Sequence, residues 1–170
     1  VTNAPNKYGN LFITKEITSD HAVPESVRDT AFELTVNLGA AMAGKMVTVA
    51  NSDRPMLYGV MADEAGNLEF RIKARQTIEL LRLPEGTKVT VTETVSDDHF
   101  EVSYRTRNHS GEAADYDNAL VIPSEGNATA VVLNHYTPSP VSVELDVAGT
   151  KIFSAEGNHN GGTFVYQVQK

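Results

Sequence analysis

Short runs in which apolar and polar residues alternate make up most of this chain. The alternation predicts strands, because neighbouring side chains on a strand point to opposite faces. Turn residues such as glycine, proline, asparagine and aspartate separate the runs. The expected strands are Leu11–Ile17, Phe32–Asn37, Met46–Ala50, Leu57–Val60, Leu68–Lys73, Thr77–Leu83, Thr87–Val95, Phe100–Arg105, Ala119–Ile122 and Ala128–Tyr136. Many short strands joined by regular turns indicate an all-β sandwich, in which Leu38–Gly44 forms at most a helical turn.

Three of these runs carry one polar residue on a face that is otherwise apolar. Lys15, Glu93 and Asn134 each occupy the same parity as the apolar residues that precede them in their run. We therefore expect all three side chains to point inward. Burial of an isolated ammonium, carboxylate or amide is costly unless such groups satisfy one another. We infer that the three side chains meet in the core.

A buried amine, acid and amide in contact have a specific chemistry. Burial disfavours the charged forms of the amine and the acid, so a neutral amine can coexist with a protonated carboxyl group. Lys15 Nζ would then attack the amide of Asn134 and release ammonia, while Glu93 moves the proton and polarises the amide carbonyl. The same pattern also permits a buried Lys15–Glu93 ion pair with Asn134 as a hydrogen-bonded neighbour, or a register that leaves one of them in solvent.

The stretches around these three residues resemble the signature stretches of pilin-type surface domains of Gram-positive bacteria. They are Leu11–Lys15, Leu83–Glu93 and Val132–Tyr136, and the resemblance extends from about Asn10 to Tyr136. It implies an immunoglobulin-like (CnaB-type) β-sandwich with an intramolecular Lys–Asn isopeptide bond, as in backbone pilins and adhesin stalks. Carried over to this sequence, the resemblance makes Lys15 and Asn134 the cross-linked pair and Glu93 the catalytic proton shuttle.

The resemblance also implies a function. The protein would be a structural shaft or stalk component of a pilus or adhesin, extracellular and attached to the cell wall. Its partners would be other pilin or stalk subunits, or further domains of the same protein, and a sortase. The Tyr-Pro-Lys motif of a backbone pilin is not visible, since Lys7 departs from it, so pilus backbone and adhesin stalk both stay open. The alternative is an adhesin domain that binds a host protein or glycan through loops, with the polar connection Arg105–Asn118 as the best site.

Composition excludes several other classes. The 170 residues are 41% apolar, which is enough for a packed core. The formal charge of −8 and the lack of a basic stripe make nucleic acid and anionic membranes poor partners. No apolar run approaches membrane-spanning length. Without cysteine, neither a disulfide nor a thiolate metal site can form.

The remaining motifs do not indicate an enzyme that turns over a substrate. The sequence has no nucleophile elbow and no dinucleotide fingerprint, so we expect only a single self-reaction per molecule. We also expect no cofactor and no metal. Asp97–His99 is the best arrangement of metal-binding residue types, but two acids and a histidine between strands are more typical of a solvated hairpin.

A composition change near the C-terminus predicts a domain boundary. Residues 1–137 form the first domain, and residues 138–140 (Pro-Ser-Pro) are expected to be a linker. In residues 141–170, Lys151 follows a threonine as Lys15 does, and Thr163–Val168 resembles Ala31–Val36. We therefore interpret residues 141–170 as the truncated start of a second, similar domain, with Lys151 as its candidate cross-link lysine. A terminal hairpin packed on the first domain is the alternative.

Overall fold

A computed structural model describes residues 7–95, 97–107, 113–115, 117–140, 152–156 and 165–169. The chain divides into two units, Val1–Thr137 and Pro138–Lys170. The helical elements are α1 (Glu25–Arg28) and one 3-10 turn (Ala40–Met42). The strands are β1 (Tyr8–Thr18), β2 (Phe32–Asn37), β3 (Met46–Asn51), β4 (Arg54–Met61), β5 (Asn67–Ile72), β6 (Thr77–Pro84), β7 (Lys88–Thr94), β8 (Phe100–Arg107), β9 (Ala113–Asp115), β10 (Ala119–Val121), β11 (Asn127–Tyr136), β12 (Ile152–Glu156) and β13 (Val165–Gln169).

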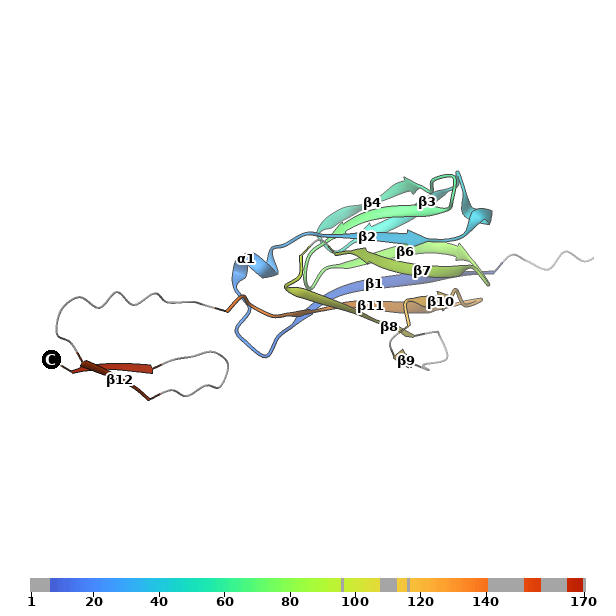
Figure 1. Ribbon diagram of the computed structural model, residues 1–170. Coiled ribbons are helices and arrows are strands. Elements are labelled where there is room, and N and C mark those ends of the chain that lie inside the picture. The colour runs from blue at the N-terminus through green and yellow to red at the C-terminus, as the bar shows by residue number, and fades with distance from the viewer. Residues whose placement is uncertain are drawn as a thin grey trace, which may run out of the picture. The chain divides into compact units, whose positions relative to one another are not determined.

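Two sheets form the first unit (Figure 1). Its described strands are ordered β4-β3-β6-β1-β11-β8-β9 in the larger sheet and β10-β7-β2-β5 in the smaller one. Alternate residues of both sheets form one buried apolar cluster, to which β1 contributes Leu11 and Ile13 and β2 contributes Leu34 and Val36. The predicted all-β sandwich is therefore confirmed.

The first and last strands of this unit, β1 and β11, are parallel neighbours inside the larger sheet (Figure 1). Their register places Lys15 opposite Val132 and Ile17 opposite Asn134. Lys15 and Asn134 are therefore two positions apart along the ladder, and both side chains point to the buried face. Each strand also has an antiparallel neighbour, β6 beside β1 and β8 beside β11.

Strand β7 brings Glu93 to the opposite side of the core. It lies between β10 and β2 in the smaller sheet, and Glu93 is paired with Leu34 of β2. Val89, Val91 and Glu93 occupy alternate positions of β7 and are all buried, whereas the residues between them are exposed or half-buried. Glu93 therefore points into the core from the smaller sheet, while Lys15 and Asn134 point into it from the larger sheet.

Two short elements differ from the sequence-based expectation. The helix α1 was not predicted, because it has four residues and buries none of them, so no apolar periodicity marks it. Strand β9 pairs with Arg105–Arg107 of β8. The connection Arg105–Asn118 was therefore wrongly predicted as one long loop, since part of it extends the larger sheet.

The second unit contains a hairpin in which β12 and β13 pair antiparallel, from Ile152 opposite Gln169 to Glu156 opposite Val165. Lys151 lies outside the described residues, so its role as a second cross-link lysine stays a prediction, as does the interpretation of this unit as the start of a similar domain. In the described part of the chain, neither helical element has the length or apolarity to cross a membrane.

Gly9 is expected to be essential for close packing at the start of β1. A Cβ atom on Gly9 would lie 2.5 Å from the backbone oxygen of Pro123 and 3.0 Å from Cγ2 of Ile122. Because the backbone oxygen cannot move away cheaply, Gly9→Ala should reduce the free energy of unfolding by about 1–3 kcal/mol. Urea unfolding monitored by circular dichroism measures this loss.

Gly59→Ala is the matched control. Its added Cβ would meet Sδ of Met46 at 2.8 Å, but Met46 is exposed and its side chain is flexible. We expect a change within about 0.5 kcal/mol. Equal losses in the two variants would contradict the close-packing argument for Gly9.

Candidate functional site

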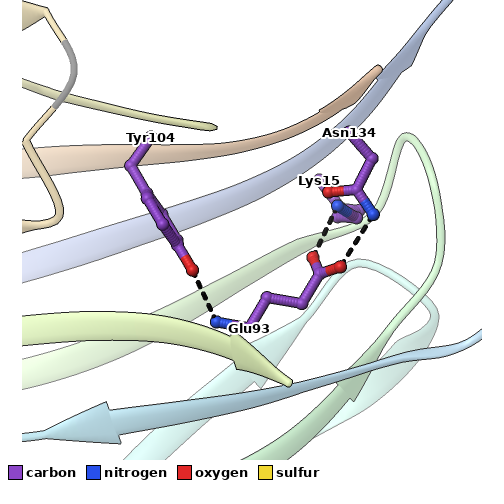
Figure 2. A network of polar contacts seen from close by, with 4 residues as sticks. All are labelled: Lys15, Glu93, Tyr104 and Asn134. Atoms are coloured by element: carbon purple, nitrogen blue, oxygen red, sulfur yellow. Dashed lines mark hydrogen bonds and ion pairs between the residues drawn. The ribbon is translucent and has the colours of Figure 1, made fainter. Parts of the chain in front are cut away.

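Lys15, Glu93 and Asn134 meet in the core between the two sheets (Figure 2). Glu93 Oε2 accepts a hydrogen bond from Lys15 Nζ at 2.7 Å, and Glu93 Oε1 accepts one from Asn134 Nδ2 at 2.7 Å. The Lys15 and Glu93 side chains are 0% and 1% exposed, and Asn134 is 0% exposed. The structure thus brings together all three residues that the sequence pattern placed on inward faces.

The amine of Lys15 is held in an aromatic environment. Lys15 is among the fully buried residues, at the end of an apolar stripe on β1. Its Nζ atom lies 4.3 Å from the centre of the Phe32 ring, and Phe100 contacts that ring edge to face at 5.1 Å. The rings exclude water from the amine while giving its cationic form a weak attraction.

Burial lowers the pKa of Lys15 from 10.5 to about 8, although its hydrogen bond with Glu93 and the charge of that carboxylate act in the opposite direction. Desolvation therefore outweighs the ion pair. With a pKa of about 8, roughly one lysine in ten is neutral at pH 7, compared with fewer than about one in a thousand for an ordinary lysine. The Lys15 amine therefore gives up its proton more easily than an ordinary lysine, whether to solvent or to Glu93, and only the neutral amine is a nucleophile.

Asn134 has one polar atom without a partner. Its Oδ1 atom is buried and accepts no hydrogen bond from any residue that the structure describes. Most buried polar atoms are paired, and an unpaired carbonyl oxygen costs about 1–3 kcal/mol. The amide nitrogen of Asn134 is therefore hydrogen-bonded, whereas the amide oxygen has no partner among the residues that the structure describes. This oxygen would carry the negative charge that develops when a nucleophile attacks the amide carbon.

Tyr104 is a fourth member of the site that the sequence interpretation missed. Its hydroxyl accepts a hydrogen bond from the backbone N–H of Glu93 at 2.8 Å (Figure 2). Burial raises the pKa of Tyr104. The hydrogen bond from the Glu93 backbone acts in the opposite direction and the charge of the Glu93 carboxylate adds to the rise, so the pKa is raised and the hydroxyl stays neutral. A signal was present, because Phe100, Val102 and Tyr104 share one parity and all pack against the core.

A pocket lies beside the end of strand β7. It has a volume of about 310 Å³, and Phe32, Glu93, Thr94 and Phe100 are among the residues that line it. Since the Glu93 side chain is almost fully buried, the pocket approaches the site without exposing it.

Asp97, Asp98 and His99 have potential ligand atoms within 4.8 Å of one another. The backbone N–H of His99 donates a hydrogen bond to Asp97 Oδ1, and the ring Nδ1 of His99 lies 3.1 Å from the carbonyl oxygen of Thr137. Both acids are exposed. The hydrogen bonds of the local turn therefore account for the proximity of these side chains.

Comparison with known proteins gives a family and a fold. A family model described as a domain of unknown function (DUF7601) matches residues 9–136. No curated protein has a matching sequence. Among solved structures, the major pilin protein T3.2 of Streptococcus pyogenes is 17% identical with a TM-score of 0.62, over 77% of this chain and 46% of that one.

Two further solved structures are similar over the same share of this chain. The T-13 major pilin protein of Streptococcus pyogenes is 22% identical with a TM-score of 0.59, over 77% of this chain and 46% of that one. The pilus-presented adhesin Cpa is 19% identical with a TM-score of 0.55, over 77% of this chain and 27% of that one. The chain thus spans less than half the length of each, and the likeness shows an immunoglobulin-like β-sandwich fold.

Proposed function

The chain belongs to the DUF7601 family, and we propose that it is a structural shaft or stalk component of a Gram-positive surface pilus or adhesin, locked by an amide bond between Lys15 and Asn134. One observation carries this proposal: a single buried carboxylate, Glu93, contacts both the lysine nitrogen and the amide nitrogen at 2.7 Å. A structural ion pair requires only the first contact. The second contact, to a group that can be displaced, supports a reaction.

The proposed reaction is balanced within the three side chains. A proton moves from Lys15 Nζ to Glu93, and the neutral amine attacks Cγ of Asn134. The Nζ–Cγ bond forms, Glu93 delivers its proton to Nδ2, and the Cγ–Nδ2 bond breaks as ammonia leaves. The Lys15 nitrogen passes its remaining extra proton to the Glu93 carboxylate, which ends neutral beside the new amide. No outside reactant is consumed, and each molecule reacts once, so the protein is not a turnover enzyme.

The unpaired oxygen of Asn134 supports a rotation of the amide before attack. Turning the side-chain amide by half a turn exchanges Oδ1 and Nδ2. A protonated Glu93 then donates its hydrogen bond to Oδ1, which satisfies that oxygen and polarises the carbonyl as negative charge develops on it. The resting and rotated amides thus give Glu93 its two roles, proton delivery to the leaving nitrogen and stabilisation of the oxyanion.

The position of the bond suits a structural module. It would join the first and last strands of the sandwich and close a loop of about 120 residues, which on the chain-entropy model for cross-links stabilises the fold by about 5 kcal/mol. The chain has no cysteine, so no disulfide can supply this stabilisation. Unlike a disulfide, an amide bond is not broken by reductants.

The proposed surroundings follow from the similar structures, which are major pilins and a pilus-presented adhesin. Partners would be other pilin or stalk subunits or further domains of the same protein, with a sortase as the enzyme that joins them. The location would be extracellular, on the cell wall. Both a pilus backbone and an adhesin stalk agree with the buried site, since either is loaded along its length.

Intact mass under denaturing conditions tests the proposal. The wild type should be about 17 Da lighter than its sequence, the mass of one ammonia, whereas Glu93→Ala and Glu93→Gln should have full mass. Fragment masses should place the loss on Lys15 and Asn134. A wild type at full mass would overturn the cross-linked stalk and leave a buried ion pair.

A further inference from the structure

On the side that faces β10, no described strand pairs with the end of β7. In this strand, the N–H of Val91 points toward β10 and donates to the carbonyl oxygen of Asn118 at 2.9 Å. Glu93 is two residues further on, so its N–H points to the same side. Strand β10 begins at Ala119 and pairs only with residues 88–90 of β7, so Glu93 lies past its end.

Tyr104 supplies the missing partner from the opposite sheet. It extends from β8 of the larger sheet across the core, and its hydroxyl accepts the Glu93 N–H at 2.8 Å (Figure 2). The backbone at Glu93 is thereby held on both sides. Strand β2 pairs with it at Leu34 on one side, and the Tyr104 hydroxyl accepts its N–H on the other. This contact ties the residue that carries the carboxylate to the sheet that carries Lys15 and Asn134.

We propose that Tyr104 is a positioning residue for the cross-linking reaction, an inference that rests on the proposed function. Glu93 must hold two contacts of 2.7 Å at once, one to each nitrogen. Without the hydroxyl, the N–H of Glu93 has no partner among the residues that the structure describes, and the strand end is free to shift. Displacements of about 1 Å from reactive geometry slow reactions by up to about a hundredfold.

The role of Tyr104 is positional rather than catalytic. Its hydroxyl contacts the backbone of Glu93, and burial keeps it neutral by raising its pKa. Removal of the hydroxyl should therefore lower the rate of bond formation without changing how that rate depends on pH. Loss of a proton donor or acceptor would instead change the pH profile.

The test follows bond formation in the full chain as it refolds. Unreacted chain is isolated from inclusion bodies in urea, its full mass is checked, and it is diluted into buffer, quenched in acid and weighed over time. Tyr104→Phe should lose ammonia at least about tenfold more slowly than the wild type once its circular dichroism shows that it has folded. The pH profile should keep its shape.

Two control variants separate positioning from stability. Tyr58→Phe removes a half-buried tyrosine hydroxyl on β4, and Val49→Ala destabilises the core from β3. Both should react within about twofold of the wild type, because neither touches the site. If Val49→Ala slows the reaction as much as Tyr104→Phe does, the positioning role is overturned.

The other outcomes are equally distinct. A wild type that loses ammonia together with a Tyr104→Phe variant that reacts as fast would overturn only the role of Tyr104. A wild type that keeps its full mass would overturn the proposed function and this inference with it. If Tyr104→Phe does not fold, amide hydrogen exchange in the wild type decides: protection of the Glu93 N–H equal to that of Val91 supports the contact, and rapid exchange overturns it.

Discussion

Lys15→Ala should destabilise the domain by more than about 5 kcal/mol, enough to unfold many domains of ordinary stability. Three losses combine in this variant. The cross-link, worth about 5 kcal/mol on the chain-entropy model, cannot form. The carboxylate of Glu93 stays buried without its cation, at a cost of about 3–5 kcal/mol. A fully buried four-carbon stem also leaves a cavity, which is a further loss that does not add simply to the others.

Guanidinium unfolding of three variants separates these losses. Lys15→Met keeps most of the volume but removes the amine, so its difference from Lys15→Ala measures the cavity. Glu93→Gln lacks the cross-link and leaves the amine of Lys15 buried without its anion, but it keeps the side-chain volume, so it should be more stable than Lys15→Ala. Lys88→Ala, at an exposed lysine on β7, controls for the loss of a positive charge. A Lys15→Ala variant with the wild-type midpoint would show that neither the cross-link nor the pair stabilises the fold.

The rate of bond formation should fall above about pH 8. Below the lowered pKa of Lys15, which is about 8, the pair Lys15–Glu93 holds one proton. The reactive arrangement is the tautomer with that proton on Glu93 and a neutral amine on Lys15. While the pair keeps one proton, the fraction of molecules in this reactive tautomer does not depend on pH. The rate of bond formation should therefore be constant between about pH 6 and pH 7.

Above the pKa the pair loses its shared proton. The amine is then neutral, but Glu93 has no proton to give to the carbonyl oxygen or to the leaving nitrogen. We expect the rate to fall about tenfold for each pH unit above 8. Refolding of unreacted chain in a series of buffers, with intact mass as the readout, measures the profile. A rate that instead rises through pH 8 would show that the neutral amine alone limits the reaction and that Glu93 is not needed as an acid.

The inward positions of the site residues could be predicted because strand parity is a strong local signal. Lys15, Glu93 and Asn134 each continue a row of buried apolar residues, and a two-residue period leaves no doubt about the face once the strand is assigned. The strand assignment itself was reliable here, because the turns between strands carry glycine at positions such as Gly66 and Gly86, where φ is positive.

The arrangement of the strands could not be predicted in the same way. Nothing local to β1 or β11 specifies that they pair in parallel, since that contact joins segments separated by most of the domain. The parity of β8 indicates that Tyr104 points inward, but its contact with the backbone of Glu93 could not be predicted. It depends on where β10 begins and leaves the N–H of Glu93 without a neighbour, which is a property of the sheet rather than of either sequence segment.

The parallel pairing of β1 and β11 determines how the domain responds to a pulling force. Parallel neighbours start at the same end, so the chain enters β1 at one end of the sandwich and leaves β11 at the other (Figure 1). A pull on these two points slides the strands past each other in shear, and the hydrogen bonds from Asn10 to Thr18 share the load instead of opening one at a time. The parallel pairing thus makes the domain resistant to pulling, and a covalent bond between β1 and β11 would prevent the two strands from separating under load.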